Sequence, residues 1–138
     1  MIKGFAHICF RVRNLDSAIA FYCDKLGLKP AFDFINENGE RFGIYIRFGG
    51  RNFLELFKAP PQKPGETAAG NEAGYQHMCL EVDDLPATVA ALRANGVQVS
   101  EPTLGKDQSW QAWLSDPEGN RIELHSYTAS SWQAPWLR

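Results

Sequence analysis

The feature that most constrains the fold of this chain is an internal repeat. The segment from His7 to Leu15 aligns with the segment from His77 to Leu85 at a constant offset of seventy residues. The alignment matches histidine, cysteine, valine and leucine, and it keeps the other apolar positions apolar. Two copies of one supersecondary unit are expected to fold as two similar modules, related by an approximate twofold axis.

Each copy of the repeat begins as an alternating strand, turns, and then enters a helix with apolar residues three and four positions apart. Both helices are expected to end at a glycine, Gly27 and Gly96, because a left-handed backbone costs least without a Cβ. Strand-rich sequence follows each helix, at residues 32–35, 42–48 and 52–57 and at residues 98–101, 109–115 and 121–127. The unit is therefore predicted to be strand, helix and three strands, used twice, in an α+β protein.

The domain organisation follows from the repeat and from composition. With 138 residues, 44% of them hydrophobic, the chain is expected to form a single domain over residues 1–128 with an ordinary core. Module one spans 1–58 and module two spans 75–128, joined by a Pro-, Gly-, Ala- and Glu-rich linker at 59–74. The apolar C-terminal tail at 129–138 is expected to dock on the domain or on a second subunit.

Charge and hydropathy argue against several classes of partner. The formal net charge is −2 with mixed signs, so no basic stripe is present for nucleic acid or for an anionic membrane surface. No apolar run approaches the roughly 18 residues that cross a bilayer, and Lys3, His7 and Arg11 interrupt the place of a signal peptide. The three cysteines lack Cys-x-x-Cys spacing and are interpreted as reduced, buried apolar side chains. A cytoplasmic protein is expected.

Two histidines and two glutamates occupy equivalent positions in the two copies. His7 and His77 lie in the first strand of each copy, and Glu55 and Glu123 lie in the last strand at an offset of sixty-eight residues. A lone histidine in a strand is more often a core or surface residue than a ligand, but a glutamate buried without a partner costs several kcal/mol. The symmetry of all four indicates a metal site, and the nitrogen and oxygen donors suit Ni, Zn, Co, Fe or Mn better than calcium.

The paired units and the His-Glu-His-Glu set resemble the vicinal oxygen chelate superfamily, and within it the glyoxalase I type. The similar strings are residues 7–12, 21–28 and 116–124, and the resemblance covers residues 3–127. It implies eight strands curved into an incomplete barrel-like cleft around one divalent metal ion, with Ni or Zn favoured. It also implies a homodimer that shares the four ligands across its subunits, with a site closed within one chain as the alternative.

The resemblance also implies lyase or isomerase chemistry on a small α-hydroxycarbonyl or hemithioacetal substrate, through an enediolate. Glu123 is expected to remove and return the proton, with Glu55 as its counterpart on the opposite face. Arg11 matches an arginine that contacts the glutathione carboxylate in the family. Lys106 lies in a loop that meets anionic substrates in the family, and Trp110, Trp113 and His125 are expected to line the cleft.

Two other functions stay open. One is an extradiol-type ring-cleaving dioxygenase, which in this superfamily is expected to bind iron through two histidines and one glutamate. Glu55 would add a fourth ligand here. A metal-free drug-binding resistance protein lacks the ligand set altogether. Glutathione is the less favoured substrate, because residues 57–60 are Phe-Lys-Ala-Pro where the resemblance leads one to expect an asparagine.

Overall fold

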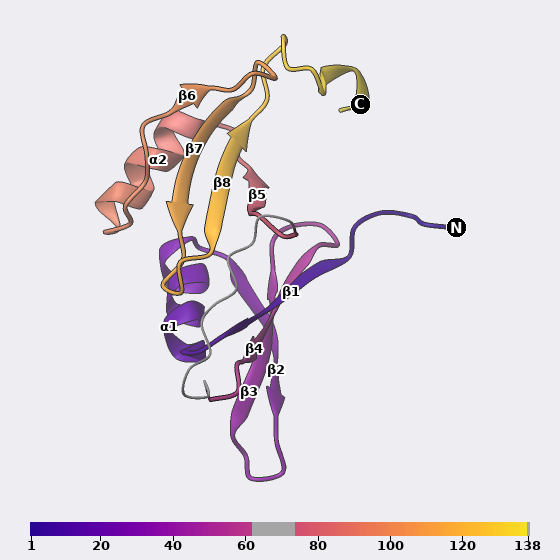
Figure 1. The fold of residues 1–138 in the computed structure, drawn as a ribbon, viewed down its shortest axis with the longest axis vertical. Helices are drawn as coiled ribbons and strands as arrows, with labels where there is room; N and C mark the ends of the chain where they lie inside the picture. The colour runs from indigo at the N-terminus through magenta and orange to yellow at the C-terminus, as the bar shows by residue number, and fades with distance from the viewer. Residues whose placement is uncertain (62–73, 138) are drawn as a thin grey trace. The chain divides into compact units, whose positions relative to one another are not determined.

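The computed structural model describes residues 1–61 and 74–137, and it divides into two compact units, residues 1–68 and 69–138. Each unit holds one copy of the repeat and forms a four-stranded sheet with a helix across one face (Figure 1). Most of the predicted linker lies outside the described residues. A single domain over residues 1–128 remains a prediction.

Module one contains four strands and one helical segment. These are β1 (His7–Val12), α1 (Leu15–Ile19) continuing as η1 (Ala20–Lys25), β2 (Lys29–Ile35), β3 (Arg41–Arg47) and β4 (Phe53–Lys58). The strand order is β1-β4-β3-β2, with β1 parallel to β4 and the other pairs antiparallel. Asn14 caps α1 by accepting a hydrogen bond from Ser17 N at 2.9 Å. The helical segment ends before Gly27, which has a φ of 75°.

Module two repeats this topology. Its elements are β5 (Met78–Glu81), α2 (Leu85–Ala94), β6 (Thr103–Leu104), β7 (Trp110–Ser115), β8 (Arg121–Ser126) and the short η2 (Ala134–Trp136). The strand order is β5-β8-β7-β6, and Asp84 caps α2 by accepting from Ala87 N at 2.9 Å. The predicted strand-helix-three-strand unit is therefore confirmed in both copies, as two open four-stranded sheets rather than a closed barrel. Among the described residues, no helix is long and apolar enough to cross a membrane.

One predicted strand is misplaced. The segment 98–101 forms no strand, and the edge strand is β6, two residues at Thr103–Leu104. Ser100 instead bridges to β7, where its amide donates to Trp113 O at 2.9 Å and its hydroxyl accepts from Trp113 N at 2.8 Å. The position of this edge strand is determined by its hydrogen bonds to β7 and not by the apolar residues in its own sequence.

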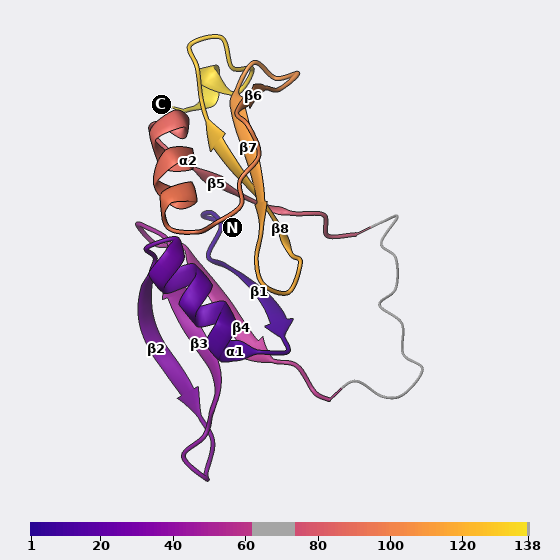
Figure 2. The ribbon, with the colours of Figure 1, turned by 90° about the vertical axis from the view of Figure 1, so that its left-hand side faces the viewer.

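The two faces of each sheet have different roles. In module one, Ile44, Ile46, Leu54 and Leu56 are fully buried on the face that α1 and η1 cover (Figure 2). Side chains alternate along a strand, so the intervening residues, including Glu55, lie on the opposite face. Module two repeats the pattern with α2 over the sheet. The uncovered face of each sheet carries the predicted ligands, and it is called the ligand face below.

Candidate metal centre

In module one, the two predicted ligands lie side by side on the ligand face. His7 and Glu55 come from the adjacent parallel strands β1 and β4, and His7 Nε2 lies 3.3 Å from Glu55 Oε2. The Glu55 side chain is only 14% exposed. Tyr45, which pairs with Glu55 across β3 and β4, places its hydroxyl 3.4 Å from His7 Nδ1. The imidazole therefore has a polar neighbour at each nitrogen, which orients the ring.

Module two has the same pair of ligands. His77 Nε2 lies 3.0 Å from Glu123 Oε2, and the Glu123 side chain is 12% exposed. Trp113 stands at the position of Tyr45, in register with Glu123, and its ring meets the His77 ring edge-on at 4.8 Å. The guanidinium of Arg121 lies 4.3 Å from the Trp113 ring. Trp113 is thus packed between a predicted ligand and a cation, and its role in binding substrate remains a prediction.

The distance between the donor atoms of each His–Glu pair suits two ligands of one metal ion. Two donors at about 2.1 Å from one divalent ion lie roughly 3.0 Å apart at right angles and roughly 3.4 Å apart in a tetrahedron. The two His–Glu separations, 3.3 and 3.0 Å, fall in this range. Each carboxylate is also largely buried, where a cation compensates its charge. The structure thus brings His7 to Glu55 and His77 to Glu123, each within its own module. One ion shared by both pairs remains a proposal.

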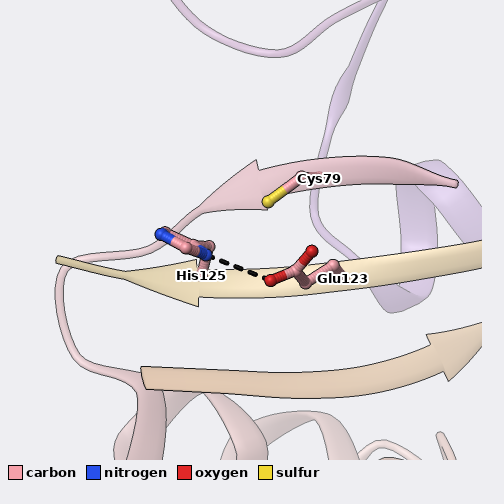
Figure 3. Close-up of side chains that lie close together, drawn as sticks. All are labelled: Cys79, Glu123 and His125. Carbon is pink, nitrogen blue, oxygen red and sulfur yellow. Dashed lines mark hydrogen bonds and ion pairs between the residues drawn. The ribbon is translucent and has the colours of Figure 1, made fainter. Parts of the chain in front are cut away.

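Within its own module Glu123 has a second imidazole neighbour, whereas the described residues of module one offer Glu55 only His7. His125 lies two residues further along β8, on the same face, and its Nδ1 is 3.1 Å from Glu123 Oε1 (Figure 3). The residue at this position in module one is Phe57. Because Oε2 faces His77 and Oε1 faces His125, both oxygens of the Glu123 carboxylate have a fixed polar partner. The two glutamates are equivalent in the repeat but differ in their surroundings.

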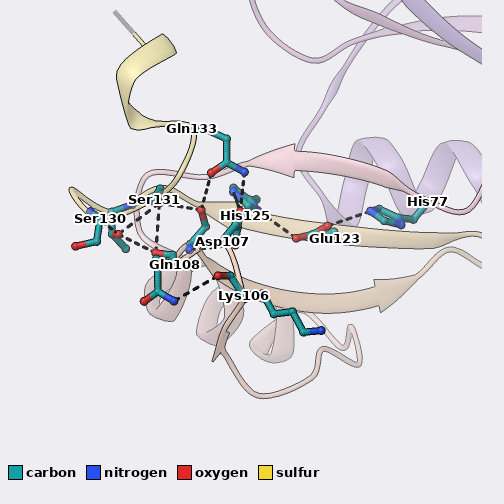
Figure 4. Close-up of polar contacts among 11 residues, drawn as sticks. His77, Lys106, Asp107, Gln108, Glu123, His125, Ser130, Ser131 and Gln133 are labelled. Atoms are coloured by element: carbon teal, nitrogen blue, oxygen red, sulfur yellow. Dashed lines mark hydrogen bonds and ion pairs between the residues drawn. The ribbon is translucent and has the colours of Figure 1, made fainter.

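His125 lies beside a loop that the C-terminal tail supports. It is 8% exposed, and its Nε2 lies 3.9 Å from Asp107 Oδ2, which is beyond hydrogen-bond distance and leaves this nitrogen without a hydrogen-bond partner among the described residues. Asp107 accepts a hydrogen bond from Gln133 Nε2 at 2.7 Å (Figure 4). The Asp107 carbonyl also accepts a hydrogen bond from Trp132 N at 2.9 Å. The bond from Gln133 is the main reason that the pKa of Asp107 lies below its ordinary value. The C-terminal tail therefore supports the loop behind His125.

Cys79 completes a second group of donors around Glu123. It pairs with Glu123 across β5 and β8, and its sulfur lies within 4.8 Å of donor atoms of Glu123 and His125 (Figure 3). Burial, followed by the nearby Glu123 carboxylate, raises the pKa of the Cys79 thiol to about 12. A thiol with this pKa stays protonated near neutral pH, so without a metal it is a neutral neighbour of Glu123 rather than a thiolate.

The interpretation of the cysteines as buried apolar side chains is wrong, because none of the three is buried. Cys9 and Cys79 are exposed residues and Cys23 is intermediate, although the atoms around the Cys79 sulfur partly desolvate it. Register places Cys9 opposite Glu55, just as Cys79 lies opposite Glu123. The sequence contained a signal for this exposure. Each of these two cysteines follows a predicted histidine ligand by two residues in its copy of the repeat, and residues two apart on a strand lie on the same face. All three are free thiols.

The raised pKa of Cys79 predicts slow alkylation. In chelator-treated protein at pH 9, a thiol of pKa about 12 is roughly one part in a thousand thiolate. Iodoacetamide should therefore modify Cys79 at least on the order of a hundredfold more slowly than in the urea-unfolded chain, as followed by peptide mass spectrometry. Glu123→Gln should speed the reaction, because it removes a negative charge that opposes the thiolate. A folded-state rate within a few-fold of the unfolded rate would contradict this placement.

The remaining predicted residues lie near these pairs. Arg11 is exposed on β1, in register with Phe57 and on the same face as His7. Lys106 is exposed in the loop between β6 and β7, next to Asp107 (Figure 4). Their contacts with substrate remain predictions. Sequence reasoning named His125 only as a residue that lines the cleft, and it missed Asp107 altogether.

Comparison with known proteins decides the family. The sequence model of the Glyoxalase/Bleomycin resistance protein/Dioxygenase superfamily matches residues 4–124. The chain belongs to this superfamily. The resemblance to vicinal oxygen chelate proteins is thereby confirmed. As the family description states, glyoxalases, resistance proteins and dioxygenases share the superfamily, so membership alone does not determine the reaction.

Curated members of the glyoxalase superfamily resemble the chain at low identity. Lactoylglutathione lyase of Haemophilus influenzae is 31% identical over 134 residues, which cover 86% of this chain and 88% of that protein. Lactoylglutathione lyase of Schizosaccharomyces pombe is 27% identical over 135 residues, and the match spans 87% of this chain but only 44% of the longer relative. The relatives support a glyoxalase-like enzyme at the level of the family.

Solved structures of the superfamily show the same fold. A glyoxalase family protein from Enterococcus faecalis superimposes with a TM-score of 0.73 at 22% identity, covering 89% of this chain and 97% of that one. TnmS3, an antibiotic binding protein from Streptomyces sp. CB03234, superimposes with a TM-score of 0.70 at 26% identity, covering 92% and 98%. The fold therefore hosts both a protein named for glyoxalase and one named for binding.

Proposed function

We propose that this superfamily member is a metal-dependent lyase or isomerase of the glyoxalase I type, acting on a small α-hydroxycarbonyl or hemithioacetal compound. The observation that carries the proposal is the duplicated His–Glu pair, with donor atoms 3.3 Å apart in module one and 3.0 Å apart in module two. A protein that only encloses a drug has no need of two such pairs at equivalent positions.

The ion would be divalent and held by His7, Glu55, His77 and Glu123, with Ni or Zn first and Co, Fe or Mn as alternatives. When bound, such an ion polarises a substrate oxygen and makes the neighbouring C–H group more acidic. A homodimer that shares the ligand set is part of the same proposal, as is a cytoplasmic location. Arg11, Lys106 and Trp113 keep their proposed roles in binding the substrate.

Glu123 is the proposed base. A general base needs a carboxylate held in one orientation within reach of the proton that it takes. The neighbours of Glu123 supply this, since His77 and His125 flank its two oxygens. Glu55 has an aromatic neighbour, Phe57, in place of the second imidazole, which supports different roles for the two glutamates. Glu55 is therefore assigned as a ligand and as the counterpart on the opposite side of the substrate.

Exchange of the α-proton tests the proposal without knowledge of the natural substrate. In D₂O, metal-loaded protein should catalyse deuterium incorporation into at least one of glycolaldehyde, hydroxyacetone and 2-hydroxyacetophenone, followed by proton NMR. Chelator-treated protein and Glu123→Gln should both leave these protons in place. Metal-loaded protein that exchanges none of the three would contradict proton-transfer chemistry at this site.

Two alternatives give different results in simple assays. An extradiol dioxygenase would consume oxygen with catechol when loaded with iron, although the additional Glu55 donor argues against the three-ligand site of that class. A metal-free binding protein would hold its ligand equally well after chelation. Loss of ligand binding on removal of the metal, without oxygen uptake in the iron-loaded protein, separates the proposed lyase from both.

A further inference from the structure

Six aromatic rings gather on module one next to the predicted metal ligands. They belong to Phe32, Phe34, Phe42, Tyr45, Phe53 and Phe57 and are called the ring cluster below. Phe32 stacks on Tyr45 with ring centroids 4.7 Å apart and planes 13° apart. Phe42 lies nearly parallel to Phe57 at 6.1 Å, and Phe34 contacts Phe57 at 5.1 Å. The rings therefore form one continuous aromatic surface.

Strand register explains why this surface begins at the metal ligands. Along β4, alternation places Phe53 and Phe57 on the same face as Glu55. Tyr45 on β3 pairs with Glu55, and Phe32 on β2 pairs with Tyr45. The aromatic surface thus extends from Glu55 across β3 to the edge of the sheet. Tyr45 links its two ends, because its ring stacks on Phe32 while its hydroxyl lies near His7.

Gly43 makes room for the Phe57 ring of the ring cluster. Gly43 pairs with Phe57 across β3 and β4, and a Cβ at Gly43 would lie 2.5 Å from a carbon of the Phe57 ring. The missing side chain lets the Phe57 ring lie over the strand. Arg11 pairs with Phe57 on its other side, from β1. A cation therefore borders the aromatic surface close to the metal ligands.

The ring cluster is not a closed core. Phe32 is 52% exposed and Phe42 is 40% exposed. Large exposed apolar patches on a protein surface mark binding sites more often than chance. Among its described residues, module two repeats only part of this surface, because Trp113 stands at the position of Tyr45 but Arg121 and His125 take the positions of Phe53 and Phe57. The larger aromatic surface lies on module one, so a substrate with one apolar end has a preferred orientation.

We infer that the substrate carries an aromatic substituent that rests on the ring cluster, beside an oxygen-rich anionic head that faces the metal ligands and Arg11. The inference rests on the proposed function, since it places that head on the proposed metal site. A flat ring gains by stacking on Phe32 and Tyr45 or on Phe42 and Phe57, whereas a methyl group covers little of this surface. The ring cluster adjoins His7 and Glu55, two of the proposed metal ligands, and is bordered by the Arg11 cation. For this reason we assign a small anionic chelator rather than a protein partner.

Mandelate and lactate provide a matched pair of probes. Both have the same α-hydroxy carboxylate head, and they differ only in a phenyl group against a methyl group. Calorimetric titration of zinc-loaded protein should show mandelate binding about tenfold more tightly than lactate, the size expected from added apolar contact and ring stacking. Phe32→Ala and Phe42→Ala should each reduce the ratio toward one while leaving lactate affinity unchanged. Phe5→Ala, an exposed aromatic before β1, should preserve the ratio.

Each other outcome has a definite reading. Equal affinity for the two acids in zinc-loaded protein overturns the aromatic substrate and leaves the proposed metal site standing. Protein that binds no zinc, or binds zinc but neither acid, fails the proposed function itself, and the inference falls with it. If Phe32→Ala lowers the melting temperature sharply and the mandelate preference stays, the ring cluster packs against protein and the inference is wrong.

Discussion

Glu123→Gln is expected to keep much of the bound metal and to lose turnover by at least about a hundredfold. The amide oxygen still coordinates a divalent ion, but it does not accept a proton as a carboxylate does. The measurement is kcat on a substrate found by the exchange assay, with metal content determined on the same sample. Glu37→Gln, an exposed residue in the β2–β3 turn, is the matched control and should leave both quantities unchanged.

A Glu123→Gln variant with metal bound and near-parental turnover would remove Glu123 from the role of base. Glu55→Gln would then be the next variant, since Glu55 holds the equivalent position in module one. The structure predicts the opposite ranking, because His125 lies beside the Glu123 carboxylate, whereas Phe57 holds the equivalent position in module one.

The second large effect concerns glutathione. Formation of lactoylglutathione from methylglyoxal and glutathione is expected to be weak, with a specificity constant below about 10⁵ M⁻¹s⁻¹, within the lower range for enzymes. A charged tripeptide needs several polar partners, and Arg11 supplies one of them. The segment after Glu55 offers Phe57, Ala59 and Pro60 with only Lys58 polar. The exposed rings of module one make this side of the site still less suited to a peptide carboxylate.

The glutathione prediction goes against the names of the relatives, two of which are lactoylglutathione lyases. The assay is a steady-state measurement at the thioester absorbance with nickel-, zinc-, cobalt- and manganese-loaded protein. The same preparations, tested with a compound whose protons they exchange in the deuterium assay, provide the positive control. A specificity constant above about 10⁵ M⁻¹s⁻¹ would show a working glyoxalase I and would mean that the missing asparagine was given too much weight.

Much of the fold was predictable because the repeat carries it. The matching histidines and glutamates in the two copies predicted a metal site, but the parallel pairing of the first and last strands, which sets each histidine beside its glutamate, was not predicted. The misplaced edge strand shows what the sequence pattern did not predict. β6 is two residues long, and its position depends on pairing with β7 and on the bridge from Ser100. No local pattern of apolar residues encodes such a contact.

The surroundings of Glu123 were less accessible from sequence. The i, i+2 spacing of Glu123 and His125 on one strand was a usable signal that the two side chains share a face. Asp107 and Gln133 lie 26 residues apart and meet only because the tail returns to the loop between β6 and β7. The ring cluster was hidden for a similar reason, since strand register brings Phe32 from β2 onto Tyr45.

Metal binding tests the central claim most directly. Protein purified without added metal or chelator should contain about one divalent ion for each set of four ligands, measured by elemental analysis. Alanine substitution of each ligand in turn should lower the affinity for zinc, as measured by competition with a chelating dye; the four variants are His7→Ala, Glu55→Ala, His77→Ala and Glu123→Ala. Protein that binds no ion, or a Glu55→Ala variant that binds zinc as tightly as the parent, would contradict the four-ligand site.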